Sequence, residues 1–221
     1  MAKKIKISPV ACLSIVVVIV AMAYLFLLRE HSWFGLERLS VRTGLFLEEA
    51  YSPAFNSEKG FLQSNLLITR KLIPFALNDS VQDVQLTWRL LAFTFGVACF
   101  YKIFFCNWRE SRSKRLFLSV AVIALLVQAV SCWLSFCLMP RIAHTIHTQV
   151  ASIQGCENGV FFNDGYTIEY LTLLQVFHVT LIQYLNMLER LFWVLLLSAV
   201  AIIATACVPL TAPPAPHKMT S

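Results

Sequence analysis

The sequence predicts an all-α polytopic membrane protein, with four transmembrane helices and helical extensions on the outer side of the membrane. Hydrophobic residues make up 58% of the 221-residue chain and charged residues 14%, and the mean hydropathy is +0.69. Soluble domains are about 45–50% apolar and about 25% charged. Four apolar runs reach the roughly 20 residues that a spanning helix needs. None alternates as a barrel strand does, and only helices and closed barrels satisfy their backbone polar groups in lipid.

The four expected spans lie at about residues 10–28, 86–106, 116–138 and 191–209. The first follows KKIK and contains AMA, which is also typical of a cleaved signal peptide. Its apolar run continues past that tripeptide to Leu28, which favours an uncleaved anchor. In this interpretation residues 1–209 form one membrane-embedded domain, and the short Pro-rich segment 210–221 is a disordered tail.

The distribution of positive charge predicts the orientation of the chain. Short segments rich in Lys and Arg stay on the cytoplasmic side of a membrane. Such residues gather before the first span and in NWRESRSKR (107–115), between the second and third spans: Lys3, Lys4, Lys6, Arg109, Arg112, Lys114 and Arg115. We therefore expect both termini and this turn in the cytoplasm, and the segments 29–85 and 140–190 on the outer side of the cell membrane, a bacterial inner membrane in our interpretation.

Helical periodicity continues into the outer segments. Apolar residues recur at helical spacing through residues 166–190 without Gly or Pro, which predicts one long helix continuous with the fourth span. Residues 33–51 are also expected to be helical. On that helix Glu37, Arg38 and Arg42 can make contacts along one face, which is either solvated or a docking surface.

The boundaries of the remaining outer elements follow from proline and capping residues. A helical piece is expected at 60–72 and a break near Pro74. The next helix is expected to start in LNDS, which offers three candidate N-caps: Asn78, Asp79 and Ser80. The chain after Pro140 is expected to lie at the membrane interface.

Small and polar residues in the spans are arranged for helix contact. They are Ala92 and Gly96 in the second span, Ala124, Gln128 and Cys132 in the third, and Ser198, Ala201 and Thr205 in the fourth. Such faces let helices approach closely, and Gln128 can hydrogen-bond across the interface. They either hold the four helices together or bind another membrane protein.

Few residues are suited to metal binding. His144 and His147 are spaced i, i+3 and lie on one helical face, so they are candidate metal ligands. A third ligand would come from Glu157, Asp164 or His178. The competing interpretation is a pair of solvated histidines. Separately, Cys137 and Cys156 are the two cysteines that could pair on the outer side.

The motifs of several protein classes are missing from the sequence. It contains no P-loop, no Gly-rich phosphate cradle, no HExxH and no GxSxG. We therefore expect no catalytic residues, no cofactor and no nucleotide. Because membrane topology accounts for the basic residues, we expect no nucleic-acid partner either. The middle of the spans lacks Asp and Glu, which disfavours an ion-coupled transporter.

The chain resembles the small integral membrane proteins of integrating conjugative elements and conjugative plasmids. The resemblance lies in a first span followed by HSWFGLERLSVRTGLFLEEAY, and in a hairpin of spans closed by an Arg-rich turn with an Arg-Glu-Ser step, NWRESRSKR. It covers about the first 140 residues, and the long outer segment after them departs from it. The resemblance implies a role near a type IV secretion or DNA-transfer apparatus, and no functional residues carry over.

Three functions are compatible with these observations. The first is a non-enzymatic membrane component or accessory of an envelope assembly, whose partners are the lipid bilayer and other membrane proteins or further copies of the chain. The second is a membrane enzyme or lipid-handling protein that uses His144, His147, Glu169 and His178. The third is a pore or channel subunit.

Overall fold

The computed structural model describes residues 9–28, 33–50, 72–105, 111–158 and 168–208, and these are almost entirely helical. The helices are α1 (Pro9–Leu28), α2 (Phe34–Ala50), α4 (Leu72–Phe105), α5 (Ser111–Trp133), the short π-helix η2 (Leu134–Leu138), α6 (Met139–Asn158) and α7 (Ile168–Cys207). Four stretches are long and apolar enough to cross a membrane: Pro9–Leu27, Phe75–Phe105, Ser113–Gly155 and Tyr170–Cys207. The predicted all-α, four-span fold class is confirmed.

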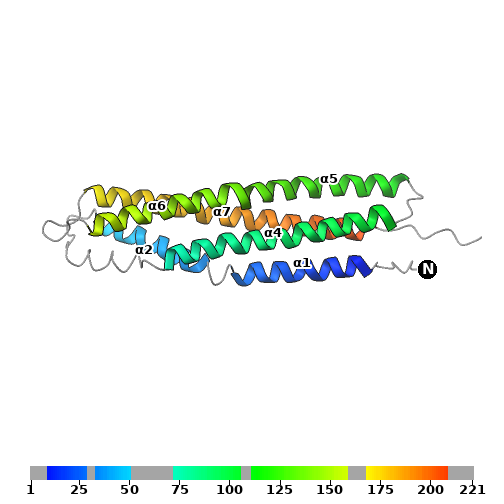
Figure 1. Ribbon diagram of the computed structural model, residues 1–221, viewed down its shortest axis with the longest axis horizontal. Coiled ribbons are helices and arrows are strands. Elements are labelled where there is room, and N and C mark those ends of the chain that lie inside the picture. The colour runs from blue at the N-terminus through cyan, green and yellow to red at the C-terminus, as the bar shows by residue number, and fades with distance from the viewer. Residues whose placement is uncertain (1–8, 29–32, 51–71, 106–110, 159–167, 209–221) are drawn as a thin grey trace, which may run out of the picture.

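The helices form one elongated bundle (Figure 1). α7 has 40 residues, so at 1.5 Å per residue it is about 60 Å long, roughly twice the thickness of a bilayer's hydrocarbon core. It contacts α1, α2, α4, α5 and α6. α1, α5 and the C-terminal parts of α4 and α7 form what we call the membrane half. We define the remainder as the extension, which comprises α2, α6, residues 72–85 of α4 and residues 168–190 of α7.

The core continues from one half into the other because each long helix keeps a heptad pattern of buried residues. In α7 the buried residues are spaced alternately by four and three: Tyr170, Leu174, Phe177, Leu181, Tyr184, Leu188, Leu191, Leu195, Ser198, Ile202 and Thr205. In α4 the same spacing gives Leu77, Ser80, Val84, Thr87, Leu91, Thr94 and Ala98. A repeat of this kind is typical of helices packed nearly parallel with a slight left-handed supercoil.

The π-helix η2 explains how the third span continues past Pro140. The N–H of Met139 donates to the carbonyl of Leu134, a five-residue step. A π-turn holds one more residue than an α-turn. The buried positions shift accordingly, from Ser131 before the turn and Ser135 within it to Met139 and Ala143 after it. The widened turn also accommodates the proline, which lacks an N–H and crowds the preceding turn of a regular helix. α6 therefore extends the same helix to Asn158, and the interfacial position expected for the chain after Pro140 stays a prediction.

The predicted start of the second-span helix is also wrong. α4 begins at Leu72, so Pro74 lies in its first turn, where the missing N–H would have no intrahelical partner. Asn78, Asp79 and Ser80 therefore lie inside the helix and do not cap it. The expected piece at 60–72 falls almost wholly outside the described residues, and residues 107–110 of the basic turn and the tail 210–221 fall wholly outside them.

Candidate functional site

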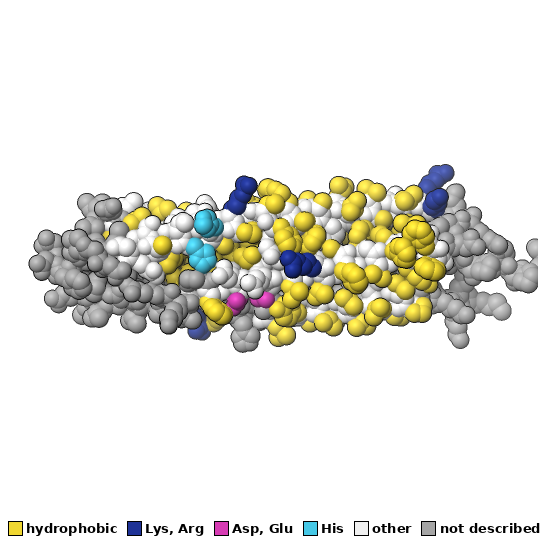
Figure 2. Space-filling model, in the orientation of Figure 1, with side chains coloured by type: hydrophobic (Ala, Val, Ile, Leu, Met, Phe, Trp, Pro, Cys, Tyr) yellow, Lys and Arg dark blue, Asp and Glu magenta, His cyan; other side chains and the backbone are white. Residues whose placement is uncertain are grey.

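An apolar surface encircles the membrane half. Large apolar side chains are exposed on every helix there, including Ile19 on α1, Phe93 on α4, Leu126 on α5 and Leu197 on α7. Figure 2 shows this surface covering the right-hand half of the molecule, the half that contains α1. Exposed apolar residues on all sides of a bundle are suited to lipid contact.

Aromatic residues mark the boundary between the two halves. Trp33, just before α2, makes an edge-to-face contact with Phe192 of α7, with ring centroids 6.2 Å apart. Trp133 and Trp193 are exposed at the same junction, and Trp88 of α4 donates its indole N–H to the carbonyl of Gln128 at 3.2 Å. Tryptophan favours the membrane–water interface because one end of its ring system is apolar and the other carries a donor.

The large apolar side chains that the extension exposes lie on α2, α4 and α7, beside exposed polar residues, and not on α6. α6 exposes polar or small residues: Arg141, His144, Thr145, Thr148, Ala151, Ser152 and Gly155. On the other side α2 exposes Phe34, Val41 and Leu45, and α7 exposes Val176, Val179 and Ile182. No exposed large apolar residue lies on α6 among the described residues. Exposed apolar side chains that gather on α2 and α7 but not on α6 make this part of the extension a candidate interaction surface.

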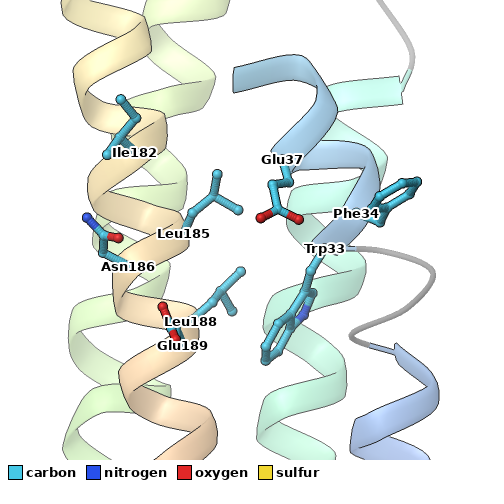
Figure 3. Close-up of a pocket in the computed structure, with 8 residues that line it drawn as sticks. All are labelled: Trp33, Phe34, Glu37, Ile182, Leu185, Asn186, Leu188 and Glu189. Atoms are coloured by element: carbon cyan, nitrogen blue, oxygen red, sulfur yellow. The ribbon is translucent and has the colours of Figure 1, made fainter. Parts of the chain in front are cut away.

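A groove with a volume of about 750 Å³ lies between α2 and α7. It is lined by Trp33, Phe34, Glu37, Ile182, Leu185, Asn186, Leu188 and Glu189. In Figure 3, Glu37 and Trp33 extend from the α2 side toward α7, while Leu185 and Leu188 extend from α7 toward them. Among the described residues, neither Glu37 nor Glu189 has a hydrogen bond or ion pair. The groove therefore combines apolar side chains with two carboxylates and the amide of Asn186.

The exposed face of α2 carries charges of both signs. Phe34, Val41 and Leu45 fall within ~40° on a helical wheel, at about 100° per residue. On the same wheel Glu37 borders this stripe on one side, while Arg38 and Arg42 border it on the other. The Arg38 guanidinium lies 4.2 Å from the centre of the Phe34 ring. We call this face, composed of Phe34, Glu37, Arg38, Val41, Arg42 and Leu45, the α2 face.

Polar pairs inside the core hold α4, α5 and α7 in register. Gln128 of α5 donates through Nε2 to Ser198 Oγ of α7 at 2.6 Å, while its Oε1 is buried without a partner among the described residues. At the far end of the membrane half, Lys102 of α4 donates to the carbonyl of Val208, just past α7, at 2.5 Å. These contacts join different helices, so they fix how the helices lie along one another.

Some residues of the predicted small-residue faces are buried between helices, and others are exposed. Ala124, Gln128, Ser198 and Thr205 are buried between helices. Gly96 is exposed, and nothing lies within 4 Å of the position that a Cβ would take. Within a single chain Gly96 therefore does not pack against another helix, because the heptad of α4 turns Thr94 and Ala98 inward. Ala92 and Ala201 are half-buried at the margins of the core.

A closer helix contact that the sequence did not indicate involves a glycine of α2. A Cβ on Gly44 would lie 3.2 Å from the imidazole of His178 on α7. His178 is half-buried by this contact, which is a packing role. Gly44 thus lets α2 approach α7 at the upper end of the groove.

The residues considered for metal binding do not converge in the described parts of the chain. His144 is exposed and His147 half-buried on α6, and no group of three His, Cys, Asp or Glu residues able to hold an ion is found within the described ranges. The side chains of Glu157, Asp164 and Glu169 lie outside them. Cys137 is a free, exposed thiol, and the side chain of Cys156 is not among those described.

Of the residues predicted to set the topology, Lys114 and Arg115 are exposed in the first turns of α5. The other five lie in undescribed segments or have undescribed side chains. Comparison of the chain with protein-family models, with curated proteins and with solved structures finds no match.

Proposed function

We propose that this chain is a non-enzymatic membrane component or accessory of a larger envelope assembly, and that it binds its partner through the exposed apolar residues of α2 and α7 in the extension. The observation that carries the proposal is the asymmetry of that extension. Six large apolar side chains are exposed on α2 and α7, whereas α6 exposes polar and small residues. A segment needed only to complete the bundle would have no reason to expose these apolar side chains.

The continuous core supports a scaffolding role. α4, α6 and α7 extend the membrane half without a hinge among the described residues, since η2 joins α5 to α6 with helical backbone. A rigid extension holds a docking surface at a fixed height above the bilayer. The resemblance to membrane proteins of conjugative elements makes a conjugation or type IV secretion apparatus the first assembly to test.

The orientation is part of the proposal. The basic residues before α1 and around the start of α5 favour a cytoplasmic location for both termini, which puts the extension outside, in a bacterial inner membrane. A reporter inserted at Ser113 that is active only in the cytoplasm should be active, and one inserted at Thr148 of α6 should be silent. The opposite pair of results would reverse the topology and place the docking surface in the cytoplasm.

Site-specific photo-cross-linking in the native host tests the docking role. A photoreactive residue at Ile182, in the groove, should form a discrete adduct with a component of the assembly. The same residue at His144 of α6 is the matched control, since that position is exposed on the polar side. Substituting Glu at both Phe34 and Val179 should abolish the adduct. Equal labelling from both positions, or no adduct from Ile182, would rule out the docking surface.

A further inference from the structure

We propose that the partner bound by the α2 face is a second copy of this chain, which forms a two-fold dimer about an axis along the membrane normal. The inference rests on the docking surface proposed above and names its occupant. It follows from the order of charges along α2 and from the symmetry that a membrane imposes.

The apolar residues of the α2 face are exposed to solvent. Phe34, Val41 and Leu45 are 47%, 59% and 55% exposed, although they lie beyond the aromatic boundary of the membrane half. α4 and α7 lie between α2 and α6, so this face points away from the rest of the extension. A neighbouring helix could cover the stripe without disturbing the core, because the residues that bind α2 to the bundle, such as Leu36, Ser40, Thr43 and Leu47, lie on the opposite side.

The membrane fixes the relative direction of two copies. Chains inserted with the same topology are related by rotation about the membrane normal, as in closed cyclic oligomers. Because α2 runs along the bundle (Figure 1), the α2 helices of two such copies are parallel. In a parallel pair of helices, the acidic side of one apolar stripe meets the basic side of the other.

The charges of α2 match this arrangement. Glu37 lies on one side of the stripe and Arg42 lies five residues later on the other side, which is the offset at which residues flanking the stripe pair between parallel helices. The dimer therefore contains two equivalent pairs, in which Glu37 of each copy faces Arg42 of the other. An antiparallel pair would place the flank that carries Glu37 against the same flank of the other copy and leave Arg42 facing the other basic flank, so the sequence of α2 is self-complementary only in the direction that the membrane allows.

The proximity of the α2 helices can be measured by disulfide cross-linking in membranes. V41C, in the centre of the stripe, should give a cross-linked dimer above the background that the native cysteines set in the parent chain. T145C, exposed on α6, should not exceed that background. A V41C cross-link no stronger than that of T145C would overturn the dimer.

Charge reversal tests the pairing within that cross-link. E37R and R42E, each added to V41C, should give about a tenfold weaker dimer, the change that about 1.4 kcal/mol represents. The combination E37R/R42E restores both pairs with exchanged signs and should recover the cross-link, which also shows that the single variants are folded. Failure of the combination to exceed the single variants would overturn the proposed pairing.

A photoreactive residue at Val41 separates this inference from the proposed function. An adduct between two copies supports the dimer. An adduct only with a different protein refutes the dimer and leaves the docking surface in place. No adduct at all refutes both.

Discussion

Ser80 Oγ of α4 and the Tyr184 hydroxyl of α7 lie 2.6 Å apart at fully buried positions in the heptad core. Ser80 also donates to the carbonyl of Leu77 at 2.8 Å. A hydroxyl has one proton, so Tyr184 must be the donor to Ser80. The two residues sit where the extension meets the membrane half, and their bond joins two helices that run through both.

Because Tyr184 is the donor, Y184F and S80A should lower the free energy of unfolding by different amounts. Y184F removes the donor and leaves Ser80 bonded to Leu77, so it should lower the free energy of unfolding by about 1 kcal/mol, the net value of one hydrogen bond. S80A leaves the Tyr184 hydroxyl buried without an acceptor and should cost more, about 1–3 kcal/mol. Denaturant titration in detergent micelles measures both. The double variant should resemble Y184F, and a Y184F cost above that of S80A would reverse the assignment.

The Gln128–Ser198 pair should respond in another way because Gln128 Oε1 already lacks a partner. Q128L removes that buried carbonyl oxygen, and the Ser198 hydroxyl can turn to the carbonyl one turn earlier in its own helix. We expect the stability of Q128L to be unchanged or slightly higher. S198A should destabilise the parent by roughly 0.6–1.7 kcal/mol, the range of interhelical hydrogen bonds in membranes, and should have little effect in the Q128L background. A Q128L cost equal to that of S198A would show that Oε1 is bonded.

Lys102 should stabilise the end of the bundle where α4 and α7 finish. It is 3% exposed and donates to the Val208 carbonyl at the end of α7, where the helix dipole also favours a positive charge. K102M keeps most of the apolar stem and should lower stability by about 1.5–3 kcal/mol, the worth of a hydrogen bond from a charged donor. K114M, at an exposed position of α5, is the control. Equal thermal midpoints for the two variants would contradict the role of Lys102.

The π-helix predicts an unusual tolerance to deletion. Removing Cys137 together with P140A should convert η2 into a regular turn and leave α5 and α6 on the same faces, because a π-turn contains one extra residue. Removing Leu125, exposed in the middle of α5, should rotate everything after it by about 100° and misfold the bundle. The two deletion variants can be compared by their yield of monodisperse protein and by their helix content. Equal loss from both deletions would show that η2 is not a removable insertion.

The sequence alone determined that this is a helical membrane protein whose apolar spans are solvated by lipid. The four apolar runs, their lengths and the scarcity of charges within them are enough to predict spanning helices, because burial in lipid depends on composition more than on neighbours. The long helix continuous with the fourth span was also predictable, since the repeat from Tyr170 to Leu188 does not depend on which helix it packs against.

The tertiary structure decided the ends of the helices and the identity of the core. Pro140 and LNDS are local signals for a break and a cap, and both were overridden. A π-turn accommodates the proline, and Tyr184 makes Ser80 part of the core. Gly96 is a small residue in a span, yet the heptad of α4 turns it outward. The close approach of α7 to Gly44 determines which residues of α2 remain exposed. The contact of Gly44 with His178 joins residues 134 positions apart, so it is fixed only when the chain is folded.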